Sequence, residues 1–437
     1  MSKYIKFKKG KCVKVEIIES LKIKEKAYIE KLENGLTIII IPKKNTNKKH
    51  IVWGTNFGSI DNHFVDPTTN KEVRIPDGVA HFLEHKMFEQ QSGVNSLDKL
   101  MSLGVEPNAY TTNDHTAYYY ECTDKFYEAL DELMDYVQNP YYTDENVEKE
   151  KGIIGQEIKM YEDDPSWRLY INGLDCMYHK NEIKLDIAGT VESISKIDKE
   201  MLYSCYNTFY NPSNMLIVAC GNFKPEELLK DIKERLIEKK DQGKIERIYE
   251  KEDETINKKY KEDKMPISIP LFMIGFKDNP NKEQKVKRHI AIEILLNILI
   301  GKSSKLYQEL YDEGLVTTRP DTGYEFSKNY AHVTIMGQSK DPKKVEEMFL
   351  KQLKEIKNNG IDDNDFKRAK RKIYGDYVIE YNDVGDIARI FLSDYMKGVQ
   401  SFDYIEDFDT VNKQYVEQML KEVFDEEKMV MSVVNCE

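Results

Sequence analysis

Two histidines and a glutamate stand together in the run His81-Phe82-Leu83-Glu84-His85. In a helix with about 3.6 residues per turn, His81 and His85 lie one turn apart, and Glu84 lies on the same arc. Two imidazoles at this spacing can bind one metal ion, and the carboxylate beside them can act as a base next to an open coordination position. The alternative is a helix whose two histidines are exposed or hydrogen-bonded in the core.

A third ligand is expected elsewhere in the chain, because a catalytic zinc site usually has three protein ligands. The predicted helix 145–160 carries apolar side chains on one side, and Glu150 and Glu157 lie on or beside that side. Carboxylates that face a core are strongly desolvated unless they are paired, hydrogen-bonded or bound to a cation. The alternative is a helix with a wide polar face and acids at its edge. Taken together with the histidine pair, the pattern favours Glu157 as the third ligand.

The second half of the sequence offers no comparable metal site. In the whole sequence, the histidines outside the motif have no second histidine at the spacing of metal ligands. They are His50, His63, His115 and His179 in the first half, and His289 and His332 in the second. His289 begins a helix that corresponds to the motif helix, but Glu293 follows at the wrong interval and no second histidine is present. One metal ion per chain is therefore predicted.

The elements that must position these residues can be recognised from turn residues and hydrophobic periodicity. In the first half, strands are expected at 36–42, 51–57, 116–122 and 214–219, and helices at 78–88, 124–138, 144–160 and 225–238. In the second half, strands are expected at 268–276 and 331–337, and helices at 286–300, 342–358 and 362–380. The order strand, helix, strand, helix pair occurs in both halves, which predicts an internal duplication.

A highly charged segment separates the two halves. Residues 238–264 are dominated by Lys, Glu and Asp and show no sustained periodicity, which is typical of a linker. The predicted organisation is a zinc-binding catalytic domain at 1–237, a charged linker at 238–264 and a second, metal-free homologous domain at 265–437.

The composition excludes several classes of protein. The net charge of −12, from 65 basic and 77 acidic side chains, argues against a nucleic-acid binder. Residues 1–9 have the charges of a signal peptide but no apolar core, and the longest apolar run, 290–300, is too short to span a bilayer. The six cysteines are scattered without paired spacing, which indicates buried thiols in a reducing compartment. A cytoplasmic protein without membrane partners is expected.

The motif residues, with others downstream, resemble the insulinase/pitrilysin family of zinc metallopeptidases. The resemblance rests on Gly78-Val79-Ala80-His81-Phe82-Leu83-Glu84-His85, Asn108-Ala109-Tyr110-Thr111, Thr116-Ala117-Tyr118-Tyr119, and Glu150 and Glu157 before Trp167-Arg168-Leu169. It covers essentially the whole chain and is similar to the half-length branch that includes the mitochondrial processing peptidase β subunit and its bacterial homologues.

The resemblance implies a fold and roles for individual residues. The fold would be α+β, with two related domains that each pack a mainly antiparallel sheet against helices and form half of a clamshell chamber. His81, His85 and Glu157 would bind Zn²⁺, and Glu84 would be the general base. Glu150 would be a second functional acid that orients the surroundings of the first histidine. Asn108, Ala109 and Tyr110 would lie on an edge strand that pairs with the substrate main chain. The alternative is an ordinary loop before the strand expected at 116–122.

The resemblance also implies a partner. The second half of family members commonly offers an Arg and a Tyr to the substrate, but here Tyr311 stands in the position of the Arg, and Val316-Thr317 replaces a small residue and the Tyr. The expected active species is therefore a heterodimer with a homologous chain that keeps the Arg/Tyr pair and can lack the zinc motif. The alternative is that Arg319, Tyr324 or a residue of a shifted alignment fills the role.

The functional prediction is a zinc endopeptidase that hydrolyses peptides or unfolded segments inside an enclosed chamber. One alternative is a non-catalytic subunit of the same fold that acts as a scaffold or peptide binder, although a scaffold does not need Glu84. Another is a metal-storage protein, which should show several ligand clusters, whereas this sequence shows one.

Overall fold

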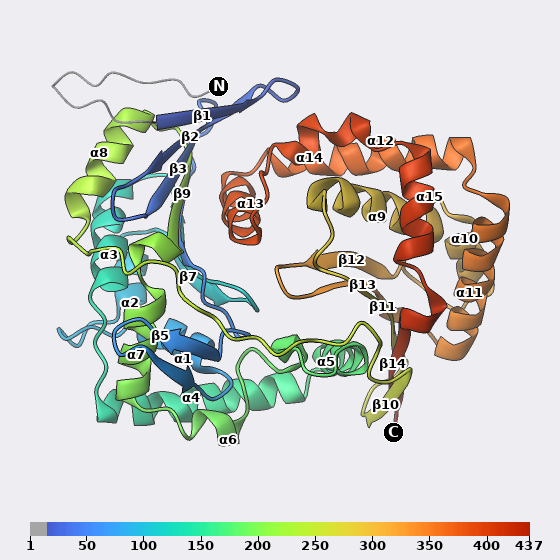
Figure 1. Ribbon diagram of the computed structural model, residues 1–437, viewed down its shortest axis with the longest axis horizontal. Coiled ribbons are helices and arrows are strands. Elements are labelled where there is room, and N and C mark those ends of the chain that lie inside the picture. Colours follow the sequence, from blue (N-terminus) through green and yellow to red (C-terminus); the bar gives the residue numbers. More distant parts are fainter. Residues whose placement is uncertain (1–14) are drawn as a thin grey trace. The chain divides into compact units, whose positions relative to one another are not determined.

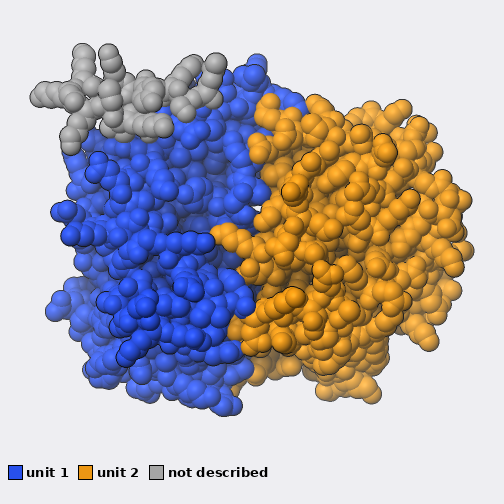
Figure 2. Space-filling view, viewed as in Figure 1, with its two compact units in different colours: residues 1–158, 186–249, 380–402 blue, residues 159–185, 250–379, 403–437 orange. Residues whose placement is uncertain are grey.

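The computed structural model describes residues 15–437. Cys12 and residues 1–9, where no signal peptide is predicted, lie outside the described residues. The chain forms two compact units (Figure 2). Unit 1 comprises residues 1–158, 186–249 and 380–402, and unit 2 comprises residues 159–185, 250–379 and 403–437.

Unit 1 is built on a seven-stranded sheet (Figure 1). In spatial order its strands are β1 Val15–Ser20, β2 Glu25–Lys31, β3 Thr37–Pro42, β9 Met215–Gly221, β4 Lys49–Thr55, β8 Thr116–Cys122 and β7 Glu106–Thr111. A separate hairpin consists of β5 His63–Asp66 and β6 Lys71–Arg74. All neighbouring strands in the large sheet run antiparallel except β3 and β9.

The helices of unit 1 cover both faces of this sheet. They are α1 Val79–Lys86, α2 Ser96–Ser102, α3 Phe126–Gln138, α4 Asp144–Glu162 (its last four residues belong to unit 2), α6 Val191–Ile194, α7 Lys199–Phe209, α8 Pro225–Arg235 and α13 Val384–Lys397. Trp53 of β4 lies in one core cluster with Phe82 of α1 and Phe126, so these helices share one face. Gly54, the next residue, leaves room for Leu392 of α13, which packs on the opposite face.

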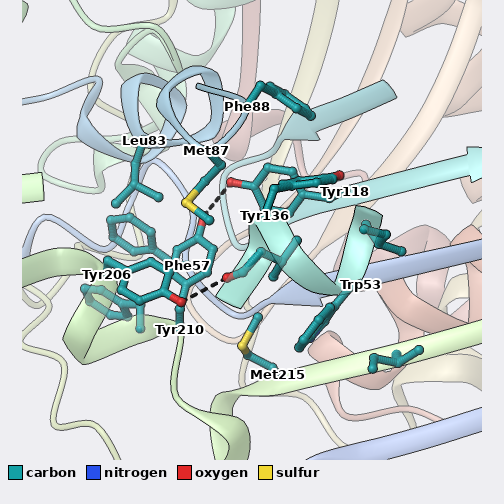
Figure 3. Packing of buried hydrophobic residues seen from close by; sticks show 14 of the residues in the cluster. Trp53, Phe57, Leu83, Met87, Phe88, Tyr118, Tyr136, Tyr206, Tyr210 and Met215 are labelled. Atoms are coloured by element: carbon teal, nitrogen blue, oxygen red, sulfur yellow. Dashed lines mark hydrogen bonds between the residues drawn. The ribbon is translucent and has the colours of Figure 1, made fainter. Parts of the chain in front are cut away.

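The core between the sheet and α1 is rich in tyrosine (Figure 3). Tyr118 and Tyr210 are fully buried, and their hydroxyl groups lie 2.6 Å apart. Tyr142 donates from its hydroxyl to the sulfur of Met87, the residue that follows α1. Such phenols contribute large apolar areas and satisfy their polar ends internally. These contacts anchor the C-terminal end of α1.

Unit 2 is built on a five-stranded sheet. In spatial order its strands are β10 Tyr260–Met265, β14 Met429–Cys436, β11 Leu271–Asp278, β13 Ala331–Gln338 and β12 Asp321–Phe326. Its helices are α5 Pro165–Met177, α9 Lys285–Ile300, α10 Lys305–Asp312, α11 Pro342–Asn359, α12 Asp363–Glu380, α14 Asp403–Glu406 and α15 Lys413–Glu422.

The strand order confirms the predicted duplication and the α+β class. In unit 1, the strands β3, β9, β4, β8 and β7 are neighbours in that order, with one parallel pair followed by antiparallel pairs. In unit 2, β10, β14, β11, β13 and β12 repeat this order and these directions. Each set also follows the same succession along the chain, so the two sheets are related element by element.

Each unit completes its fold with a helix from the other half of the sequence. Helix α5, from the first half, packs on β14 and β11 of unit 2, and α13, from the second half, packs on β9 and β4 of unit 1. The contiguous ranges 1–237 and 265–437 therefore do not coincide with the compact units. The predicted linker 238–264 contains no helix, but its end, from Tyr260, forms the edge strand β10. The division into a catalytic and a metal-free domain stays a prediction.

Two sequence expectations concern the whole chain. Among the described residues, no helix is both long and apolar enough to cross a membrane. The cysteines of residues 15–437 are all free thiols: Cys122, Cys176, Cys205 and Cys220 are buried, and Cys436 is half-buried.

Candidate active site

Helix α1 is short and almost entirely buried, which holds the motif in place. It starts after Gly78, whose φ of +91° is favourable only for glycine, and where a Cβ atom would lie 2.4 Å from the carbonyl oxygen of Ala188. Phe82 and Leu83 are fully buried in the core of unit 1. Because these two side chains fix the rotation of α1 about its axis, His81 and the other motif residues lie together on the side of the helix away from this core.

The structure brings the three predicted ligands together. His81 Nε2 lies 3.6 Å from Glu157 Oε1, and His85 Nε2 lies 3.4 Å from Glu157 Oε2. One ligand atom from each of the three residues lies within 4.8 Å of the others, and among the described residues this is the one such group of histidine, cysteine or acidic side chains. The predicted convergence of α1 and α4 is therefore present in unit 1.

The donor set and spacing fit zinc. Ligand atoms about 2.0–2.2 Å from a tetrahedral Zn²⁺ lie about 3.3–3.5 Å from one another. His85 Nε2 lies 3.4 Å from Glu157 Oε2, which is within this range, and His81 Nε2 lies 3.6 Å from the other oxygen, Oε1, which is just outside it. Two imidazoles and one carboxylate, partly open to solvent at His85 and Glu157, are a ligand set that zinc hydrolases use with the remaining position open.

Glu84 lies beside these ligands in a buried position. It is 7% exposed, and Thr111 Oγ1 donates a hydrogen bond of 2.6 Å to its Oε2. Burial raises the pKa of Glu84 above its ordinary value, although the neighbouring His81 and the Thr111 hydroxyl act in the opposite direction. A raised pKa makes the Glu84 carboxylate a stronger base than an ordinary glutamate, which suits it to accept and return a proton.

Glu150 contacts the second histidine of the motif rather than the first. Its Oε1 lies 3.1 Å from His85 Nδ1, which corrects the expectation that it orients the surroundings of His81. A carboxylate can only accept, so Nδ1 donates the hydrogen, which leaves Nε2 of the neutral ring with the lone pair that a metal needs. Helical geometry could place Glu150 toward α1 but could not distinguish two histidines one turn apart.

Charge and burial act together on this pair. Burial alone would raise the pKa of Glu150, but the hydrogen bond from His85 and the charge of Lys86 lower it overall. Burial alone would lower the pKa of His85, but the hydrogen bond to Glu150 and the nearby Glu84 raise it. These partners favour a proton on His85, so a metal ion that binds this ring would have to displace that proton.

The segment of Asn108, Ala109 and Tyr110 forms strand β7 at the edge of the sheet, as predicted, and not a loop. The Thr112 N–H donates to the His115 carbonyl, so this pair is a hydrogen-bonded pair of the β7–β8 hairpin. Because such pairs alternate along antiparallel strands, the backbone groups of Ala109 and Thr111 point to the edge rather than to β8. The outward-pointing Ala109 N–H donates a hydrogen bond of 2.8 Å to Oδ1 of the neighbouring Asn108.

The two residues that were alternatives for the missing substrate clamp are both engaged within unit 2. The Tyr324 hydroxyl is buried and donates to Asp278, which also pairs with Arg288. Arg319 lies 3.4 Å from the Thr322 hydroxyl. Tyr311, in the position expected for the Arg, is 53% exposed. The engagement of Tyr324 makes it a poor substitute for the expected phenol.

Comparison with known proteins decides the family. Residues 71–191 match a sequence model described as insulinase (peptidase family M16), and residues 196–373 match one described as the peptidase M16 inactive domain. The chain is 37% identical over 413 residues to YmfH of Bacillus subtilis (strain 168), named an uncharacterised zinc protease, with 93% of this chain and 96% of the relative covered. The chain belongs to the insulinase family, peptidase family M16. YmxG of the same organism, also named an uncharacterised zinc protease, is 24% identical over 409 residues, covering 90% and 95%.

Solved structures agree with this assignment. A protein from Alicyclobacillus acidocaldarius described as an M16-like peptidase is 33% identical, with a TM-score of 0.90 over 96% of this chain and all of that one. A protease from Helicobacter pylori, at 16% identity, shares the fold alone, with a TM-score of 0.81 over 94% of this chain and all of that one. The chain therefore has the size and fold of half-length M16 proteins.

The two acids on α4 should contribute differently to metal binding. We expect Glu157→Gln to weaken zinc binding more than Glu150→Gln, because Glu157 offers an oxygen to the ion, whereas Glu150 acts through His85. An expected difference is about tenfold, since partners of a ligand typically affect affinity by about 10–100-fold and a ligand by more. Chelator competition on both variants measures the ranking. The opposite ranking would mean that the roles of the two acids are reversed.

Thr111 belongs to the segment 108–111 that resembles the family, but the sequence did not predict its hydrogen bond to Glu84. We expect Thr111→Val to raise the pKa of Glu84, because the lost hydrogen bond stabilised the carboxylate. The base must be ionised, so the acidic limb of the kcat/KM profile should shift to higher pH by about one unit, and the rate at low pH should fall. Thr69→Val, an exposed position on the β5–β6 turn, is the control. An unshifted acidic limb in Thr111→Val would show that the Thr111 hydroxyl does not influence the catalytic base.

Proposed function

We propose that the chain is a zinc-dependent endopeptidase that hydrolyses peptides or unfolded segments. The observation that carries the proposal is the convergence of His81, His85 and Glu157 next to the buried carboxyl group of Glu84. Family membership supports peptide hydrolysis as the reaction class, and the names of the relatives support zinc. A protein that only stored metal would not need a carboxyl group with a raised pKa beside a single ligand set.

The chain's own residues divide the work of amide hydrolysis. His81, His85 and Glu157 would hold the ion, which supplies Lewis-acid polarisation of the scissile carbonyl and of water when bound. Glu84 takes the proton from the attacking water and passes it to the leaving amine. Thr111 holds Glu84 in place through its hydroxyl, and Glu150 fixes the tautomer of His85.

The substrate would bind as an added strand on β7. Ala109 and Thr111 present their backbone groups at the edge of the sheet, so an extended peptide can pair with them and be read by its main chain. Asn108 would release the Ala109 N–H when the peptide binds. Because Thr111 lies on the same strand, the peptide would be aligned directly beside the side chain that holds Glu84. This arrangement favours unfolded segments over folded proteins.

We further propose that the active species is a heterodimer with a homologous chain that supplies the missing Arg and Tyr and completes the chamber. A positioned cation or phenol near the scissile carbonyl contributes about 3 kcal/mol to transition-state stabilisation, or roughly a hundredfold in rate. The isolated chain should therefore be slow, and a homologous chain that keeps the Arg/Tyr pair should raise kcat about a hundredfold. Activity is assayed with the mass in solution measured in parallel. Full turnover by a monomer or homodimer, without gain from the second chain, would refute the heterodimer.

The principal test combines metal analysis with cleavage. We expect the purified chain to carry one zinc per polypeptide and to cleave a pool of denatured peptides. Removal of zinc with a chelator should stop cleavage, and one equivalent of zinc should restore it. Zinc that is bound without any cleavage, both alone and with the homologous chain, would instead support a non-catalytic scaffold or peptide-binding subunit of the same fold.

A further inference from the structure

Lys86, the last residue of α1, has a side chain without any exposed surface. Lysine is among the residues least often fully buried, because an ammonium group taken out of water must be paired. Here its Nζ lies 2.7 Å from Glu89 Oε2 and 3.5 Å from Glu150 Oε2. A buried cation therefore stands directly behind the acid that contacts His85.

The two oxygens of Glu150 are held from two sides. Oε1 accepts from His85 Nδ1 at 3.1 Å, and Oε2 faces the ammonium group of Lys86. The carboxylate is only 7% exposed at its side chain, so water contributes little to its orientation. A carboxylate with one donor could rotate about its last bond, whereas donors on both oxygens fix its plane.

The charges alternate outward from the proposed metal centre. Beyond Lys86, Glu89 Oε1 lies 3.9 Å from Lys149 Nζ, at the solvent-exposed end of the series. In order, the groups are His85, Glu150, Lys86, Glu89 and Lys149. Each buried charge in this series therefore has an opposite charge on the side away from the metal. Such pairing is needed because an unpaired charge in a low-dielectric environment is strongly destabilising.

We propose that Lys86 is a positioning residue for the metal centre. By holding the second oxygen of Glu150, it fixes the carboxylate that orients the ring of His85, and Nε2 of His85 consequently points toward Glu157 and the ion. This inference rests on the proposed zinc function and adds to it a residue that contacts the ligand His85 through Glu150. A partner that holds a ligand directly, as Glu150 does, commonly changes metal affinity by about 10–100-fold.

A purely structural role makes different predictions. A lysine in the last turn of α1 also interacts favourably with the carbonyl end of the helix and with Glu89, so its loss would lower the melting temperature in either case. Only a positioning role predicts a change in the affinity and geometry of the metal site in a chain that remains folded. The test must therefore measure these two properties and not stability alone.

The experiment compares Lys86→Met, the double variant Lys86→Met/Glu89→Gln, and Lys233→Met. The double variant leaves no unpaired acid at position 89 if the single variant folds poorly. Lys233 of α8 pairs with the buried Glu30 at 2.8 Å in the same unit and serves as the matched control. Zinc affinity is measured by chelator competition, and the visible spectrum of the Co²⁺-loaded chain reports ligand geometry.

We expect zinc affinity to fall at least tenfold, with an altered Co²⁺ spectrum, in both Lys86 variants. The Lys233→Met variant should lose stability and keep wild-type affinity and spectrum. Wild-type affinity and spectrum in a folded Lys86 variant would overturn the inference, and so would failure of both variants to fold, which would make Lys86 structural. Failure of the wild-type chain itself to bind zinc would instead overturn the proposed function.

Discussion

Glu84→Gln should reduce peptide cleavage by about 1000-fold or more while one zinc per chain remains bound. General-base catalysis contributes about 10²–10⁴ in rate, and the amide of glutamine cannot accept the proton from the attacking water. The substitution keeps the size of the side chain, and its carbonyl oxygen can still accept the hydrogen bond from Thr111. Single-turnover cleavage of a fluorogenic peptide, with zinc content measured on the same sample, checks both parts.

A matched control for this variant is Glu148→Gln on α4, an exposed residue paired with Lys151. It removes the same charge from the same unit and should leave the rate and the zinc content unchanged. Retained cleavage in Glu84→Gln would remove Glu84 from the chemistry. Loss of zinc together with cleavage would instead show that Glu84 is a ligand.

His81→Ala and His85→Ala should each abolish stoichiometric zinc binding and cleavage. A catalytic zinc site usually has three protein ligands, so either substitution leaves two, and the loss of affinity should exceed the roughly 10–100-fold change typical of a group that only holds a ligand in place. The chain should still fold, because the core of unit 1 is formed by residues such as Phe82 and Leu83 and not by the two imidazoles. Zinc analysis and circular dichroism of both variants measure these expectations.

His63→Ala is the control for the histidine variants, since His63 pairs with Glu72 on the separate β5–β6 hairpin. It should keep zinc and activity. Retained stoichiometric zinc in His81→Ala or in His85→Ala would exclude that histidine from the site, and unfolding of either variant would show that the motif also supports the core.

Hydrophobic pattern and turn residues predicted the central elements of the sheets to within a few residues. Strand β8 has the predicted bounds of 116–122, and α11 differs from its prediction by one residue. The strands β1 and β2 were not predicted, because their half-exposed residues give no continuous apolar run. Strand β10 was hidden in the charged segment for the same reason, since alternate residues of an edge strand face solvent.

The exchange of α5 and α13 between the two halves could not be predicted from the sequence. An amphipathic pattern shows that a helix has an apolar face, but it does not show which sheet that face covers. Gly54 leaves room for Leu392, and Gly173 of α5 leaves room for Met273 of β11. These contacts join residues more than 90 positions apart, and they become recognisable only once the sheets are formed.

The candidate site was predictable where local periodicity determines it. The spacing of His81 and His85 and the side of α4 that carries Glu157 follow from helical geometry. The partner of Glu150 and the hydroxyl of Thr111 depend on how two helices and a strand meet, which spacing alone does not determine. The position of Lys86 was not predicted, because sequence patterns place lysine at the surface by default.

The most direct test of the account is the position of the metal in crystals of the wild-type chain, measured by anomalous diffraction on both sides of the zinc absorption edge. The account predicts one zinc per chain, about 2.0–2.2 Å from Nε2 of His81, Nε2 of His85 and an oxygen of Glu157. A zinc ion at any other position, or none in crystals grown with zinc, would contradict it.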